Sequence, residues 1–388
     1  MLHDYTHSLP DLLQSLIDSN RPALFRSNAF RVIGLPAYAV PTEIRKQADK
    51  IRFSLRQGQR LNQSVRGPLP LDLPPLDETV SEALQRLNDP ELRFVDEFFW
   101  FWPTPGQRKS DPALLALHSR DIDTAIEIWV GEARRPEDHG RSAHNLAVMF
   151  HTLALDIEYA RETEEISGEL ESVQYRYWQK GLLQWQVVLN TETFWADLDQ
   201  RVAELNDPRL PVKAASQMRA GLPLVLLLLS AQIAVRACAS GTTNEALKYR
   251  ALIQESGFAE EIVEAAIGRT AQLLRKSIST SRKTAEHNSE RDREAADESV
   301  RRLLDQTQPL IVAIDFLVPG MDISNEVRDE VATAATNCLY FLTDRTTKTE
   351  VVCDLLERTR PYAVSLAVKE KIDDLRAAFL RAAYKTGR

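Results

Sequence analysis

Cysteine and glycine are both scarce in this chain. Among 388 residues there are three cysteines and 14 glycines. Cys238, Cys338 and Cys353 lie far apart and form no CxxC pair, which excludes a disulfide framework and the paired thiols of a zinc ribbon. Few glycines among many Ala, Leu, Glu and Arg residues favour helices over strands and turns. We therefore predict an all-α fold with reduced, buried thiols, as expected for a cytoplasmic protein.

Motifs of the common enzyme classes are also missing. The sequence has no phosphate-binding loop and no GxGxxG, GxSxG or HExxH motif. The best candidates for metal chemistry are three residues spaced by seven, His144, His151 and Glu158. They share one face of a predicted helix, but successive members lie about 10 Å apart along its axis, too far for one ion. We interpret them as partly buried residues that are hydrogen-bonded inside a helical core, with zinc binding as the alternative. We predict no enzyme activity, cofactor or metal site.

A run of apolar residues long enough to span a membrane is missing too. The most apolar stretch, Leu222 to Leu229, lies between Arg219 and Arg236, which enclose only 16 residues. A bilayer requires about 20. The first residues show no basic flank followed by an apolar run, so we expect no signal peptide. The stretch is therefore predicted to be a buried core helix, with a membrane-associated helix as the alternative.

Positive charge is scarce overall but concentrated in one segment. The net charge is −8, which gives no general affinity for nucleic acid. Between residues 44 and 66 there are nevertheless seven basic residues and a single acidic one, Asp49. The basic residues are Arg45, Lys46, Lys50, Arg52, Arg56, Arg60 and Arg66. The apolar residues that recur between them at helical spacing are Ile44, Ala48, Ile51 and Leu55. Thr42 stands where an N-cap would. The segment predicts an amphipathic helix with a basic face.

The surroundings of this helix have a recognisable pattern. The chain reads NAFRVIGLP before it, EIRKQADKI within it, a Pro-rich loop after it, and EALQRLNDPELRFVDEF beyond the loop. This order of four helices over residues 28–102 resembles a J-domain, the module through which co-chaperones engage heat-shock chaperone ATPases. The resemblance implies that the basic second helix docks on an acidic surface of the ATPase. Arg56-Gln57-Gly58 stands where the family has His-Pro-Asp, so stimulation of ATP hydrolysis is not implied.

The rest of the chain also has helical patterns. An amphipathic helix over Leu9 to Ser19 makes residues 1–27 a lead-in segment. SRDIDTAIEIW and AHNLAVMFHTLALD are similar to tetratricopeptide repeats, so 103–220 is predicted to be a helical-repeat-like region. Residues 221–388 are predicted to form a C-terminal helical bundle. They include a long charged helix near 258–304, whose polar part (279–302) either projects into solvent or is a disordered break.

Aromatic residues are concentrated at the end of the J-like segment. The side chains concerned are Phe98, Phe99, Trp100, Phe101 and Trp102. A cluster of this size is too apolar to leave in water. We interpret it as a buried hinge between residues 28–102 and the region that follows. The alternative is an exposed aromatic site for a partner.

These patterns lead to one functional hypothesis and one alternative. The hypothesis is a non-enzymatic adaptor or atypical co-chaperone that binds a protein partner, such as a chaperone-type ATPase, without stimulating ATP hydrolysis. The partner-binding residues would be Arg45, Lys46, Lys50, Arg52, Arg56 and Arg60. The alternative is a nucleic-acid-associated subunit that uses the same basic helix for phosphate contacts. A basic helix that is merely solvated remains the third interpretation of this segment, and a membrane partner is not expected.

Overall fold

A computed structural model describes residues 24–57, 67–73, 75–107, 110–161, 164, 166–342 and 348–385. The regular structure in these ranges is helical throughout, so the predicted all-α class is confirmed. The described residues form two compact units, one up to Leu229 and the other from Ser230. Residues 28–102 and 103–220 therefore belong to one unit, and the boundary that we predicted at 220/221 lies instead inside a helix. The predicted lead-in helix lies outside the described residues.

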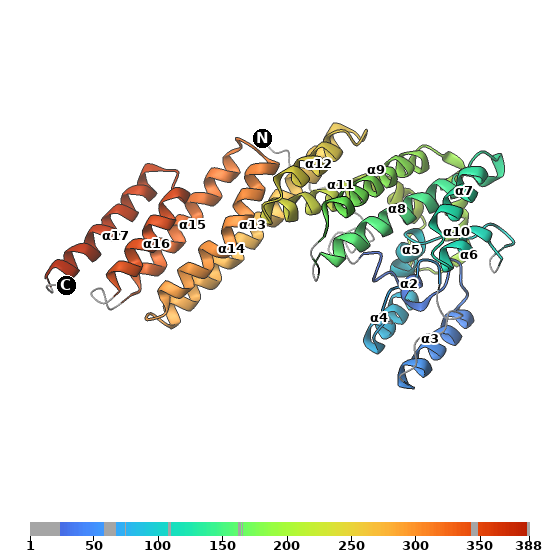
Figure 1. Ribbon diagram of the computed structural model, residues 1–388, viewed down its shortest axis with the longest axis horizontal. Coiled ribbons are helices and arrows are strands. Elements are labelled where there is room, and N and C mark those ends of the chain that lie inside the picture. The colour runs from blue at the N-terminus through green and yellow to red at the C-terminus, as the bar shows by residue number, and fades with distance from the viewer. Residues whose placement is uncertain are drawn as a thin grey trace. The chain divides into compact units, whose positions relative to one another are not determined.

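The first unit begins with four helices over residues 28–102 (Figure 1). They are α2 (Ala29–Ile33), α3 (Pro41–Arg56), α4 (Asp77–Asn88) and α5 (Pro90–Phe98). The side chain of Asn28 caps the start of α2, and Gly34, with φ of 73°, ends it. The predicted N-cap of α3 is wrong. Pro41 is the first helical residue and Val40 the N-cap, because proline has no amide hydrogen to leave unpaired and its φ already suits a first turn.

The same unit continues with longer helices. They are α6 (Pro112–His118), α7 (Ile122–Glu132), the 3₁₀ turn η2 (Pro136–Asp138), α8 (Arg141–Ala160), α9 (Gly168–Leu189), α10 (Glu192–Leu205) and α11 (Ala214–Ala239), which continues into the second unit. Small residues allow the long pair α8 and α9 to approach closely. A Cβ built on Gly181 of α9 would lie only 2.1 Å from Cδ2 of His151 on α8. The glycine is therefore part of how these helices pack.

The aromatic cluster lies at the centre of the first unit. Each of its five side chains is at most 3% exposed. The ring of Phe98 stacks on Trp185 of α9 with 5.6 Å between centroids, and that of Phe101 stacks on Trp129 of α7 at 5.7 Å. Burial of the cluster was predicted correctly, and the alternative of an exposed aromatic site is wrong. The cluster is not a hinge between separate domains either, because the helices on both sides of it share one compact unit.

The Leu-rich stretch lies within α11. Among the described residues, this is the one helix that is long and apolar enough to cross a membrane by length and composition, and 67% of its most apolar window is buried. Leu222 and the leucines at 226–229 are at most 2% exposed. This burial is what we expected of a core helix, since a bilayer-facing helix would present these side chains outward.

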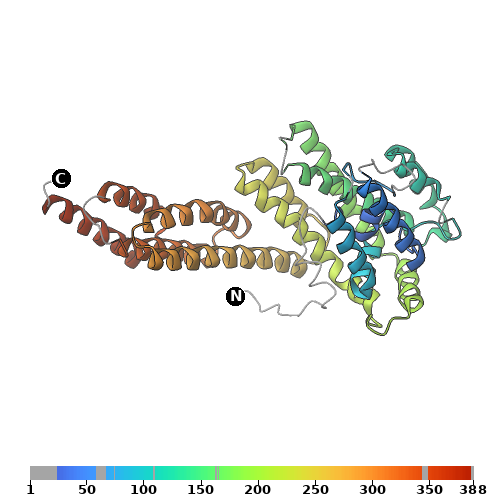
Figure 2. The same ribbon diagram turned by 90° about the horizontal axis from the view of Figure 1, so that it is seen from below.

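The second unit is a set of packed helices. They are α12 (Thr243–Gln254), α13 (Glu260–Arg291), α14 (Ala296–Leu317), α15 (Asp322–Tyr340), α16 (Thr349–Thr359), the 3₁₀ turn η3 (Arg360–Tyr362) and α17 (Leu366–Lys385). In both views, α13, α14 and α15 run side by side (Figures 1 and 2). Their shared core includes Ile278, Leu304, Ile314, Val331 and Leu339.

The polar stretch 279–302 differs from both of its predicted forms. It neither projects into solvent nor breaks into disorder. The chain turns after Arg291, and the carboxylate of Asp292 accepts a hydrogen bond from the amide of Ala295 at 3.2 Å before α14 begins. Ala285 and Ala296 are buried on the two sides of the turn. Small side chains therefore provide the contacts that a search for large apolar residues overlooks.

Two details of the second unit concern single residues. Pro309 lies inside α14 and removes one backbone hydrogen bond from that helix. In α17, Ile372, Leu375 and Phe379 are buried in the core, whereas Leu366 at the start of the helix is 71% exposed.

Candidate functional site

The basic face of α3 is on the surface of the first unit. Ile44, Ala48 and Ile51 are buried on the side that packs against α2 and α4. The side chains of Arg45, Lys46, Lys50 and Arg56 are exposed on other sides of the helix. None of these four forms an ion pair with another residue in the described part of the chain. Their charges are therefore available to a partner, screened only by water and salt.

The backbone that leads into α3 is held firmly to the core. The guanidinium of Arg93 on α5 donates a hydrogen bond to the carbonyl of Ala39 at 3.0 Å. The indole of Trp100 donates to the carbonyl of Leu35, also at 3.0 Å. Both donors come from the segment around the aromatic cluster. As a result, the orientation of the first turn of α3 is fixed by the core of the unit.

One predicted partner-binding residue is engaged within the chain. Arg52 is half-buried, its Nη2 donates to the hydroxyl of Ser81 at 3.0 Å, and its Nε lies 3.5 Å from a carboxylate oxygen of Asp77. Arg52 therefore connects α3 to α4, which corrects its assignment to the free basic face. Arg60 lies outside the described residues, so its assignment stays a prediction.

An exposed aromatic residue completes the face of α3, and the sequence reasoning missed it. Phe53 has 64% of its surface exposed. It follows Lys46 by seven residues and Lys50 by three, which places all three on one side of the helix. The signal was in the sequence, because Phe53 is out of step with the buried positions 44, 48 and 51. The exposed face of α3 thus combines several cations with one apolar side chain, and Asp49 is the acidic residue exposed among them.

His144, His151 and Glu158 do not form a metal site. His144 donates through Nε2 to the carbonyl of Phe98 at 2.6 Å, and the indole of Trp185 donates to Nδ1 of His151 at 3.1 Å. Glu158 accepts from the side chain of Gln174 at 2.9 Å. All three are buried, and the described residues contain no cluster of His, Cys, Asp and Glu that could hold an ion. The predicted role as hydrogen-bonded core residues is confirmed.

Burial also determines the charge state of the two histidines. Desolvation lowers the pKa of His144 to about 4 and that of His151 to about 3. The hydrogen bond from His144 to the carbonyl of Phe98 opposes this shift only in part. Both imidazoles are therefore neutral near pH 7, and neither is placed to exchange protons with solvent.

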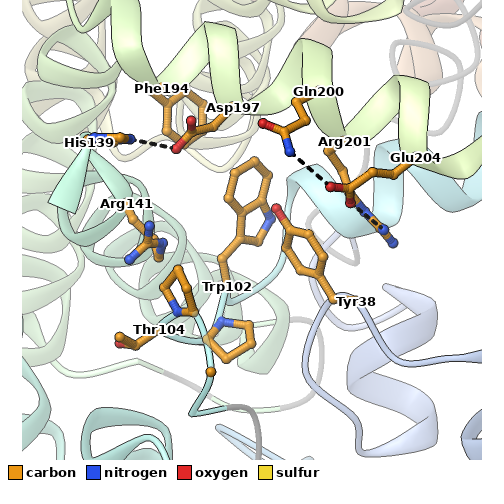
Figure 3. Close-up of a pocket in the computed structure, with 13 residues that line it drawn as sticks. Tyr38, Trp102, Thr104, His139, Arg141, Phe194, Asp197, Gln200, Arg201 and Glu204 are labelled. Carbon is orange, nitrogen blue, oxygen red and sulfur yellow. Dashed lines mark hydrogen bonds and ion pairs between the residues drawn. The ribbon is translucent and has the colours of Figure 1, made fainter. Parts of the chain in front are cut away.

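The first unit also contains a surface pocket that the sequence did not indicate. Its volume is about 380 Å³, within the range of small-ligand sites. Figure 3 shows its walls: α10 with Asp197 and Arg201 on one side, the loop after Trp102 on another, and Tyr38 and Arg141 between them. These residues are far apart in the sequence and follow no motif. Only the packing of α5, α8 and α10 brings them together.

Tyr38 has an unusual backbone at this pocket. Its φ is 66°, in the left-handed region that residues with a Cβ seldom adopt. The ring lies edge-on to Trp102 with 5.6 Å between centroids, and the guanidinium of Arg201 lies 4.3 Å from the ring centroid on its face. Burial raises the pKa of Tyr38, so its hydroxyl stays protonated at neutral pH. Contacts from two segments thus hold the strained residue in place.

Comparisons of the chain with protein families, with curated proteins and with solved structures found no match. The two surface features just described, the basic face of α3 and the pocket beside Trp102, are therefore interpreted from their own geometry.

Proposed function

We propose that this chain is a non-enzymatic adaptor that binds an acidic segment of a protein partner through α3. The observation that carries the proposal is the composition of the exposed face. Lys46, Lys50 and Arg56 are exposed cations without an ion pair in the described chain, and Phe53 lies among them with 64% of its surface exposed. An exposed aromatic side chain of this kind is typical of the centre of a protein–protein interface.

Charge and shape have separate roles in this proposal. The cations attract an acidic partner over several ångströms and raise the association rate. Phe53 then supplies apolar contact that salt does not screen. The hydrogen bonds to the backbone of Leu35 and Ala39 anchor the segment that leads into α3, so the helix need not be ordered on binding. The resemblance to a J-domain favours a chaperone-type ATPase as the partner, and the absence of His-Pro-Asp favours binding without acceleration of ATP hydrolysis.

The test is affinity capture from the native host with the full chain as bait. The α3 variant is Lys46→Glu/Lys50→Glu/Arg56→Glu. Its matched control, Arg134→Glu/Lys276→Glu/Lys283→Glu, makes the same charge change at exposed positions elsewhere. We expect a discrete protein to be captured by the wild type and the control and lost from the α3 variant. If the two variants capture the same proteins as the wild type, α3 is a solvated surface and the proposal is wrong.

Two follow-up measurements refine the result. If the captured partner hydrolyses ATP, its turnover is measured with and without the purified chain, and an increase would contradict the non-stimulating role. Gel shifts of a DNA or RNA duplex over a salt series test the nucleic-acid alternative. Duplex binding that falls steeply with salt and disappears in the α3 variant would favour that alternative over a protein partner.

A further inference from the structure

The pocket beside Trp102 is independent of the basic face of α3. Its floor is apolar, with Trp102, Pro103 and Phe194, and its rim carries charged groups from α8 and α10 (Figure 3). An apolar lining with a few charged groups is the usual composition of a site that takes a small molecule. Which molecule it could take depends on which rim charges are already paired.

Most of the charged groups on the rim have partners. Arg201 makes a two-pronged contact with the buried carboxylate of Glu97, at 2.5 and 3.2 Å, and its Nη1 also lies 3.5 Å from Glu204. A carboxylate oxygen of Asp197 lies 2.9 Å from Nδ1 of His139. The other carboxylate oxygen of Glu204, Oε1, accepts a hydrogen bond from the side-chain amide of Gln200 at 3.2 Å.

Arg141 is the exception. It is half-buried at the first position of α8 and lines the pocket, yet it forms no hydrogen bond or ion pair with any residue in the described part of the chain. The backbone amide of Ser142 at the start of α8 does not replace the guanidinium of Arg141 as a donor to an anion. This amide already donates to the carboxylate of Asp138 at 3.1 Å. An anion in the pocket would therefore be held by the guanidinium of Arg141, whose planar array of donors matches two oxygens of a carboxylate or a phosphate.

The backbone around the pocket shows a second unusual feature. Five described residues other than glycine have positive φ, and two of them, Tyr38 at 66° and His139 at 53°, line this pocket. Such conformations are uncommon for residues with a Cβ and are concentrated at binding and catalytic sites. Here they occur at Tyr38 and at His139, two residues before Arg141. Strained backbone thus lies at two places in the wall of the pocket.

We propose that this pocket binds a small organic anion. A carboxylate or phosphate group of the ligand contacts Arg141, and the apolar part of the ligand lies over Trp102 and Pro103. Glu204 lies 3.5 Å from the guanidinium of Arg201, and Asp197 lies 2.9 Å from Nδ1 of His139, so both carboxylates already have a donor within the chain. This proposal does not rest on the binding role of α3.

The test is isothermal titration of the full chain with four probes. Phenyl phosphate and benzoate carry both an anion and an apolar ring, inorganic phosphate carries the anion alone, and benzyl alcohol carries the ring without the charge. Each is titrated into the wild type, Arg141→Gln, Arg141→Lys and the control Arg134→Gln. Arg134 is an exposed arginine that does not line the pocket.

We expect phenyl phosphate or benzoate to bind the wild type and Arg134→Gln equally. Binding to Arg141→Gln should be about tenfold weaker or more, because a charge-assisted contact is lost, and Arg141→Lys should retain part of it. Whichever aromatic anion binds more tightly identifies the oxyanion as phosphate or carboxylate. Three results would each overturn the proposal. The aromatic anions could bind Arg141→Gln as tightly as the wild type, benzyl alcohol could bind the wild type as tightly as the anions, or neither aromatic anion could bind the wild type.

Discussion

Arg31 and Asp156 form a two-pronged ion pair across 125 residues of sequence. Nη1 of Arg31 lies 2.9 Å from Oδ1 of Asp156, and Nη2 lies 2.6 Å from Oδ2. The side chain of Arg31 is 3% exposed and that of Asp156 is 26% exposed. The pair joins α2, the first described helix, to α8, and Nε of Arg31 also donates to the carbonyl of Leu69 at 3.0 Å. The start of residues 28–102 is thus connected to the centre of the first unit.

Removing one partner of this pair should destabilise the first unit. In Asp156→Asn, the nearly buried guanidinium of Arg31 loses its counter-charge, and we expect a loss of about 2 kcal/mol in the free energy of unfolding. The matched control is Asp72→Asn, which breaks an equally short pair with Arg120 at 2.6 Å where both side chains are exposed. Its cost should stay below about 0.5 kcal/mol. Urea denaturation followed by circular dichroism measures both, and equal costs would contradict the role of burial.

Stability should decrease in mild acid. The folded-state pKa values of about 4 for His144 and about 3 for His151 lie below the unfolded value of about 6.5. Below about pH 6.5 the unfolded chain therefore binds more protons than the folded chain. The stabilisation is fully present above this pH and is lost as the pH falls towards the folded-state pKa values. We expect each histidine to lower the free energy of unfolding by roughly 1 kcal/mol for each pH unit of acidification in this range. His151→Phe, which keeps an aromatic ring, should reduce the slope.

The comparison for the acid effect is the wild type over the same pH range. A slope that is the same in the wild type and in His151→Phe would show that groups other than this buried histidine cause the loss of stability.

Substitution of Gly181 should be among the most damaging single changes in α9. A Cβ at this position would lie 2.1 Å from Cδ2 and 2.5 Å from Nε2 of His151. That ring cannot move aside, because it stacks on Trp178 with 4.3 Å between centroids. We expect Gly181→Ala to cost about 2 to 3 kcal/mol of unfolding free energy. Gly131→Ala is the matched control, since a Cβ there meets nothing within 4 Å and alanine favours the helix by up to about 1 kcal/mol. Thermal unfolding of both variants should show shifts of opposite sign.

The three thiols should differ in reactivity. Cys338 is buried, and desolvation raises its pKa to about 11, whereas Cys238 and Cys353 are only partly buried. Because the thiolate is the reactive form, iodoacetamide near pH 8 should modify Cys338 last. Peptide mapping by mass spectrometry after timed alkylation measures the order. In denatured protein, which is the control, all three thiols should be modified at similar rates. Early modification of Cys338 in the native protein would contradict its burial in α15.

Phe53 and the cations of α3 should respond differently to salt once a partner has been captured. Phe53→Ala should weaken binding by about tenfold at both low and high salt, because apolar contact is not screened. Lys46→Ala should slow association at low salt and have little effect at high salt. Surface plasmon resonance at two salt concentrations separates the two effects. A Phe53→Ala variant that binds like the wild type would show that the face acts through charge alone.

The helical class and the basic face could be predicted because they depend on local sequence. Helical spacing of Ile44, Ala48 and Ile51 already indicates which side of α3 is buried. The exact helix start could not be inferred from Thr42 alone, since the preference of proline for a first turn outweighed a side-chain cap. Arg52 belonged to the predicted face by spacing, but its contact with Ser81 depends on how α4 packs.

The pocket could not be predicted at all. Tyr38 and Arg141 have no local pattern that would mark them, and Arg141 is distinguished only by the partner that it lacks after folding. The turn at Asp292 was equally hidden, because a polar segment with few large apolar residues gives no periodic signal. These features depend on tertiary packing, which local sequence patterns do not reveal.

The aromatic core has a consequence for spectroscopy. All six tryptophans lie in the unit that ends at Leu229, and each is at most 4% exposed. They are Trp100, Trp102, Trp129, Trp178, Trp185 and Trp195. Residues 230–388 contain no tryptophan. Intrinsic fluorescence therefore reports the melting of one unit, while the far-ultraviolet signal sums the helices of both. The wild-type chain can thus reveal, without any introduced label, whether its two halves unfold together or in sequence.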